Sequence, residues 1–149
     1  MDGAPGEHAA SRAPVDPRAR ARNRPSTWED PALVQVWGPR YSDYVVAEDA
    51  VAAFTRGRLP EAPGARRLAE GLAARLDAFL DGASMPYGEV GHALGEPPNR
   101  LRYAATTGTI RIRWTGARQP TIWTVPRPDV DPRDARLELV RRYVHVFGP

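Results

Sequence analysis

The clearest periodic pattern in the chain predicts a helix over residues 65–80. Its apolar side chains recur at steps of three and four residues, a spacing that gives an α-helix one apolar stripe. The stripe is made of Leu68, Leu72, Leu76 and Phe79. A second pattern of this kind predicts a final helix that starts at Asp131, with a proline next to it, and runs to Gly148. Its apolar face needs a neighbour and is made of Leu137, Val140, Val144 and Phe147.

Short runs of β-prone residues predict two pairs of strands. Residues 34–37 and 44–46 form the first pair, with a Gly-Pro step between them. Residues 109–114 and 121–125 form the second, a hairpin whose loop contains glycine and proline. A short helix over residues 48–56 is predicted after the first pair.

Two short helices are predicted between the long helix and the hairpin. The first opens at Ser84 and ends near Leu94, and the second spans Asn99 to Thr106 after a Glu-Pro-Pro break. Two short helices joined by a few residues form a helix-turn-helix. Because a hairpin follows directly, the predicted fold is an α+β winged helix, with an additional short N-terminal strand pair and a C-terminal helix.

Composition excludes several kinds of protein. The chain has 149 residues, of which 42% are hydrophobic, and this is enough for one domain with a core. It has no cysteine, which excludes a disulfide scaffold, a thiolate zinc site and a cysteine nucleophile. All 21 basic residues are arginine, a bias typical of a high-GC bacterial gene. With neither a membrane-length apolar run nor a secretory signal, we expect a cytoplasmic protein without a membrane partner.

The first 27 residues have the composition of a tail. Alanine, arginine, proline and glycine dominate them, and their apolar residues show no period. We therefore predict a disordered Arg/Pro-rich leader over residues 1–27 and a folded winged-helix domain over residues 28–149. A mis-assigned start or a basic arm that lies along DNA are the alternative interpretations of the leader.

Charge is concentrated in one segment of the chain. Residues 99–127 carry six arginines and no acid, whereas residues 28–98 carry six arginines and eleven acids. An uncompensated basic segment of this kind predicts a polyanionic partner.

The second short helix carries side chains suited to a DNA groove. With Leu101, Ala104 and Ala105 as its buried stripe, a spacing of 100° per residue turns a polar set outward. That set is Asn99, Arg102, Tyr103 and Thr106, flanked by Arg100. Arginine pairs with guanine or phosphate and asparagine with adenine, so the set predicts contact with bases in the major groove. An ordinary solvated helix surface is the alternative.

The hairpin is predicted to act as a wing. Ile110, Ile112 and Trp114 share one face of its first strand, and Arg111 and Arg113 share the other. Arg118 and Gln119 lie near the tip of the loop, so three arginines would meet phosphates or the minor groove. Exposed arginines also protect hairpins from unwanted strand pairing, which is the alternative. Trp28, Trp37, Trp114 and Trp123 are expected to fill the core rather than to stack on bases.

Residues for catalysis or metal binding are few. His8, His92 and His145 lack the spacing of metal ligands, and no phosphate-binding or nucleophile motif is present. The acidic pairs Glu29-Asp30 and Glu48-Asp49 are typical of helix starts or loops. We predict no catalytic residue, no metal and no cofactor.

Four segments of the chain carry a family resemblance, namely residues 29–40, 101–108, 111–120 and 134–149. They resemble a family of bacterial winged-helix DNA-binding proteins related to the alkylpurine and interstrand-crosslink DNA glycosylases. The resemblance implies tandem winged-helix modules around a DNA channel, and it implies that some members excise damaged bases. It further implies a Gln–aliphatic–Gln or Gln–aliphatic–Asp motif that positions the hydrolytic water. Neither Gln35 nor Gln119 completes that motif, so the chain resembles a truncated middle portion of the family.

These observations predict a module that binds double-stranded DNA through helix 99–106 and wing 109–125, without clear catalysis. A fragment or divergent member of the glycosylase-like base-excision family is the alternative. A winged helix that binds another protein, or a decayed gene product, is a third. Additional winged-helix modules missing from this chain are possible partners under the family resemblance.

Overall fold

The computed structural model describes residues 30–116 and 118–148, and for Phe147 the backbone only. The chain divides into two compact units, residues 1–30 and 31–149, and every element below belongs to the second. The predicted leader lies outside the described residues. The leader and the domain boundary at residue 28 therefore stay predictions.

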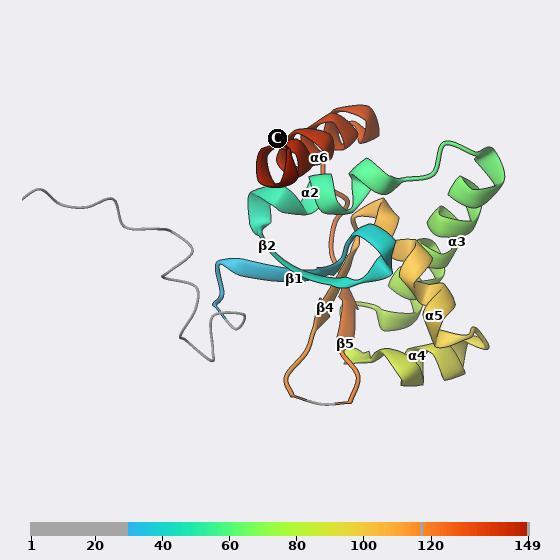
Figure 1. The fold of residues 1–149 in the computed structure, drawn as a ribbon. Coiled ribbons are helices and arrows are strands. Elements are labelled where there is room, and N and C mark those ends of the chain that lie inside the picture. Colours follow the sequence, from blue (N-terminus) through green and yellow to red (C-terminus); the bar gives the residue numbers. More distant parts are fainter. Residues whose placement is uncertain (1–29, 117, 149) are drawn as a thin grey trace, which may run out of the picture. The chain divides into compact units, whose positions relative to one another are not determined.

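The described strands form one antiparallel sheet. They are β1 (Leu33–Trp37), β2 (Asp43–Ala47), β3 (Met85–Pro86), β4 (Ile110–Arg113) and β5 (Thr121–Thr124). Their order is β2-β1-β4-β5-β3, and both predicted strand pairs are confirmed (Figure 1). The N-terminal pair is not a separate addition, however, because Gln35 of β1 pairs with Ile112 of β4. This pairing makes β4 a central strand.

Helices and short 3-10 segments surround the sheet. The α-helices are α2 (Val51–Phe54), α3 (Pro63–Leu80), α4 (Tyr87–Leu94), α5 (Pro98–Leu101) and α6 (Pro132–Phe147). The 3-10 segments are η2 (Pro39–Tyr41), η3 (Glu48–Ala50), η4 (Arg56–Arg58) and η5 (Arg102–Thr107). The long helix and the final helix are therefore confirmed, and the described residues have a mixed α/β architecture.

Three predicted helices are built differently from the expectation. Residues 48–56 divide into η3, α2 and the start of η4. Residues 85–86 form β3 because a proline disfavours helical backbone in the residue before it, and Met85 instead pairs with Ile122. Residues 98–101 are α-helical, but the chain then tightens into a 3-10 helix up to Thr107.

The first face of the sheet carries the main core. Trp37, Ile110, Ile112 and Ile122 pack there against α3, α4, α5 and η5. The α3 residues in this core include Leu72, Leu76 and Leu80, and each buried leucine stabilises the fold by roughly 1.5–3 kcal/mol. Leu80 takes the inner place expected for Phe79, which is 39% exposed.

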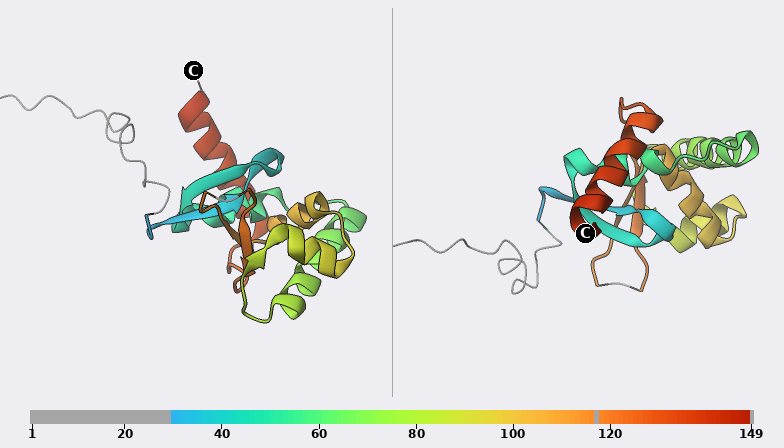
Figure 2. Two further views of the ribbon diagram at one scale, coloured as in Figure 1. Left: turned by 90° about the horizontal axis from the view of Figure 1, so that it is seen from below. Right: turned by 45° about the horizontal axis from the view of Figure 1, so that its top comes forward.

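The second face carries a smaller core over β1 and β2. Val36 and Val46 pack against Ala50 and Val51, with Tyr44 and Phe54 at the margin. Helix α6 lies against α2 and η4 rather than on the sheet itself (Figure 1, Figure 2). Gly57 permits this contact, because a Cβ there would lie 2.8 Å from the carbonyl oxygen of Ala135.

The predicted apolar face of the last helix points away from the rest of the described fold. Leu137, Val140 and Val144 are 49%, 55% and 56% exposed, whereas Ala135 is buried. Arg136 holds the helix in this orientation, donating from Nε to the Gly57 carbonyl at 3.1 Å and from Nη2 to the Leu59 carbonyl at 2.9 Å. The sequence did not predict that Ala135 and Arg136, rather than the apolar face, would attach α6 to the fold.

Candidate nucleic-acid interface

The segment α5–η5 presents part of the predicted polar surface. Leu101, Ala104 and Ala105 are fully buried, as the sequence predicted. Asn99 and Arg100 lie on the exposed side of α5, and Tyr103 is 40% exposed. Arg100 forms an ion pair with Glu96 one turn earlier, with Nε and Oε2 separated by 3.5 Å. Glu96 also pairs with Arg75, and the Arg100 side chain is 48% exposed, so the Arg100 guanidinium remains available to a stronger anion.

Thr106 is not on the exposed surface, contrary to the prediction. Its side chain is buried, and its hydroxyl donates a hydrogen bond to the carbonyl of Tyr103 at 2.9 Å. The helical spacing of 100° per residue does not apply here, because η5 is a 3-10 helix with three residues per turn. The segment also packs against α3 and β4.

Arg102 also has a structural contact that the sequence did not predict. Its Nη1 donates to the carbonyl of Tyr41 at 3.3 Å, and its guanidinium lies over the rings of Trp37 and Tyr87 at 5.6 and 5.9 Å. The side chain is therefore part-buried against the aromatic end of the core. The prediction that Arg102 points outward with Asn99 is wrong.

Arg111 is the largest departure from the predicted wing. The alternation along β4 is as predicted, but β4 lies inside the sheet and the Arg111 side chain is buried, with its guanidinium turned back onto neighbouring backbone carbonyls. Its Nη1 donates to the carbonyls of Gly108 and Ile110 at 3.0 and 3.3 Å, and its Nη2 lies 3.4 Å from Oε1 of Glu48. Burial lowers the pKa of Arg111, and the nearby Glu48 carboxylate opposes that shift. The predicted exposure of Arg111 is wrong.

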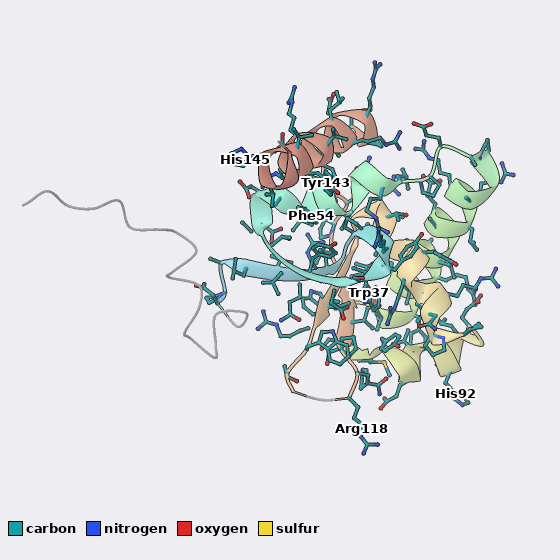
Figure 3. The ribbon with its side chains drawn as sticks, in the orientation of Figure 1. Trp37, Phe54, His92, Arg118, Tyr143 and His145 are labelled. Carbon is teal, nitrogen blue, oxygen red and sulfur yellow. The ribbon has the colours of Figure 1, made fainter. Side chains whose placement is uncertain are left out.

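The loop between β4 and β5 keeps one predicted arginine exposed. Arg118 extends from this loop away from the rest of the molecule (Figure 3). Gln119 turns inward instead, and its Oε1 accepts a hydrogen bond of 2.9 Å from the backbone N–H of Gly88. This bond ties the loop to the first turn of α4.

Arg113 lies in a groove on the second face of the sheet. It is half-buried, and the groove has a volume of about 410 Å³. The side chains that line it include Glu48, Arg111, Arg113, Trp123, Val125 and Pro128. Trp37 fills the core as predicted, whereas Trp123 is partly exposed in this groove. The sequence did not reveal the groove, because it depends on the pairing of β1 with β4.

The described residues place the other candidate groups apart from one another. His92 on α4 and His145 on α6 are both exposed and lie at distant parts of the fold (Figure 3). Within residues 30–116 and 118–148, no three His, Asp or Glu side chains come together as a metal site. No helix in the same part of the chain is long and apolar enough to cross a membrane. Gln35 is buried, and its Oε1 accepts a hydrogen bond from the backbone N–H of Trp114 at 2.8 Å.

The fold belongs to a class that includes part of a DNA glycosylase. The solved structure of Streptomyces sahachiroi DNA glycosylase AlkZ matches 81% of this chain, with a TM-score of 0.56 and 15% sequence identity. The match covers 41% of that chain, so this chain spans less than half the length of the similar protein. No protein-family model and no curated protein sequence matches the chain. At this identity the likeness shows the fold alone.

Proposed function

We propose that the described residues form a winged-helix module that binds double-stranded DNA. The proposed DNA-binding surface combines α5–η5 with the β4–β5 loop, and the observation that carries it is the Gln119–Gly88 hydrogen bond, which ties that loop to α4, the helix directly before α5. Asn99, Arg100, Tyr103 and Arg118 are its exposed DNA-binding residues, and Arg113 lies at the far end of β4. The fold of a DNA glycosylase supports DNA as the partner.

In this proposal, three predicted contact residues act as positioning residues instead. Arg102 fixes η5 against the aromatic rings, Gln119 fixes the loop, and Arg111 fixes β4 beside Gly108. The protein would work in the cytoplasm at the nucleoid, and further winged-helix modules would extend the DNA contact.

Base excision is the second candidate function, and the likeness to a glycosylase fold favours it. It ranks second because excision needs a positioned water molecule, and the described glutamines are occupied. The side-chain oxygens of Gln35 and Gln119 both accept backbone hydrogen bonds. Incubation with duplex DNA that contains an alkylated purine, followed by alkaline strand cleavage, separates the two functions. Strand cleavage above the protein-free control would promote excision to first place.

The test of DNA binding is the dependence of duplex affinity on salt. Each lost phosphate contact lowers the slope of log affinity against log salt by about 0.9. The double variant Arg100→Ala/Arg118→Ala should therefore lower the slope by about two. Arg67→Ala/Arg133→Ala is the matched control, because it removes two exposed arginines from α3 and α6 and should leave the slope unchanged. Equal effects of the two variants, or no binding at low salt, would contradict the proposal.

A further inference from the structure

Among the described residues, helical cover on the second face of the sheet lies over β1 and β2, and a groove lies over β4 and β5. Because Gln35 pairs with Ile112, Val36 lies beside Arg111 on this face, and the next register pair joins Arg111 to Trp123. Val36 is sealed beneath Ala50 and Val51, at the junction of η3 and α2. Beyond it, the face of β4 and β5 opens into the groove that Arg113 and Trp123 line. The sheet therefore changes from a closed core to an open surface within one row of residues.

The open half has the size and the side chains of a ligand site. Its volume of about 410 Å³ lies within the range of small-molecule pockets, roughly 300–1,000 Å³. An aromatic ring, two guanidinium groups and one carboxylate meet there, beside the apolar surface of Val125 and Pro128. A hydrophobic core does not need charged groups beside an aromatic ring. The ring suits a planar ligand and the guanidinium groups suit an anionic one, so the combination indicates a ligand with planar and anionic parts.

Arg111 is held in place before any ligand arrives. The carbonyls of Gly108 and Ile110 fix its guanidinium, so binding an anion costs it little side-chain entropy. Its carboxylate partner, Glu48, is 3.4 Å away with a side chain that is 70% exposed. A buried cation whose carboxylate partner is mostly exposed to solvent, together with Arg113, gives the groove a favourable potential for negative charge.

We propose that this groove binds a nucleotide, with its base against Trp123 and its phosphate on Arg113. Trp123 and Arg111 are cross-strand partners, so the base lies beside the pair formed by Arg111 and Glu48, and these two groups face its polar edge. Stacking on an aromatic ring together with arginine contacts to phosphate is the chemistry of single-stranded nucleic-acid sites. A free nucleotide and a nucleotide within an unpaired strand share this chemistry. The groove lies on the opposite face of the sheet from α5 and η5, which pack against Ile110 and Ile112.

Fluorescence anisotropy with a short labelled single strand tests the proposal, and the same strand annealed to its complement is run in parallel. Replacing Trp123 by Leu removes one stacked base, so single-strand affinity should fall about 5- to 150-fold. Duplex affinity should change less than about two-fold, because α5 is untouched. Arg113→Ala should also weaken the single strand. Tyr103→Leu is the matched control, since it removes an exposed aromatic ring from the duplex surface and should spare single-strand binding.

Competition identifies the form in which the nucleotide binds. Displacement of the labelled strand by a free deoxynucleoside monophosphate assigns a free nucleotide, and displacement by an unlabelled strand alone assigns an unpaired strand. Trp123→Phe keeps an aromatic ring and should restore most of the affinity, which separates stacking from misfolding. The proposal is overturned if folded Trp123→Leu binds the strand as the wild type does. It is also overturned if inorganic phosphate or an acidic peptide displaces the strand as well as a nucleotide does.

Discussion

The two faces of the sheet differ in what covers them, although the same strands build both. On the first face, Ile110 and Ile112 of β4 are sealed by α3, α4, α5 and η5. On the second, Arg111 and Arg113 of the same strand lie where helical cover ends and a groove begins. The first face therefore stabilises the fold, whereas the second also offers polar groups to a ligand. A substitution on one face should therefore leave the stability or the binding that the other face provides unchanged.

The largest expected effect comes from the first face. Leu76 is fully buried in the middle of α3, so Leu76→Ala removes packed methyl groups and leaves a cavity. The free energy of unfolding should fall by about 2–5 kcal/mol, measured by urea denaturation. Binding of duplex and single strands by the remaining folded protein should match the wild type, because no ligand-facing residue changes. A loss below about 1 kcal/mol would show that this face is less tightly packed than the contacts indicate.

On the second face, the buried arginine should matter more than its neighbour. Arg111→Ala leaves the carbonyls of Gly108 and Ile110 without their donor, and hydrogen bonds from a charged group contribute about 1.5–3 kcal/mol. Arg113→Ala is the matched control, because Arg113 is half-buried on the same strand and should cost at most about 0.5 kcal/mol. Urea denaturation of the two variants gives the comparison. Equal losses would mean that Arg111 does not support the strand.

The same contrast explains which features the sequence could predict. Periodicity is local, so it located α3 and α6 within two residues of their starts and placed the two isoleucines of β4 on one face. The exposure of a side chain, in contrast, depends on contacts between distant segments. Arg111 is buried in a sheet whose central strand β4 pairs with β1, and the sequence of β4 alone does not show this pairing. The alternation of side chains therefore shows which residues share a face of a strand, but it does not show which face meets solvent.

In the candidate interface, too, local sequence patterns predicted some positions correctly and missed those that depend on the rest of the fold. Asn99 and Arg118 remain exposed because one lies in the first turn of a helix and the other near a loop tip. Arg102 and Thr106 were misplaced because the chain tightens into η5 after Leu101, and sequence periodicity did not distinguish a 3-10 helix from an α-helix there. The groove with Glu48 and Trp123 joins segments more than 70 residues apart, and no local pattern connects them.

A smaller effect is expected where the β4–β5 loop meets α4. Gln119→Ala removes the acceptor for the Gly88 backbone N–H, and the cost in unfolding free energy should be about 0.5–1.5 kcal/mol. Duplex affinity should fall as well, because the loop that carries Arg118 would no longer be tied to α4. Gln119→Glu keeps an acceptor oxygen and is the matched control for stability. Unchanged duplex affinity in Gln119→Ala would show that the loop is not positioned through this bond.

The smallest effect is expected at Phe79, on the outer side of α3. Phe79 is 39% exposed, so truncation to alanine forfeits only part of the burial energy of an aromatic ring. Alanine is the better helix former by up to about 0.7 kcal/mol, which offsets some of that loss. The free energy of unfolding should therefore stay within about 1 kcal/mol of the wild type, well below the change for Leu76→Ala three residues earlier in the same helix. Urea denaturation of both variants under one set of conditions makes the comparison. A loss at Phe79 as large as that at Leu76 would mean that the outer side of α3 is covered in solution.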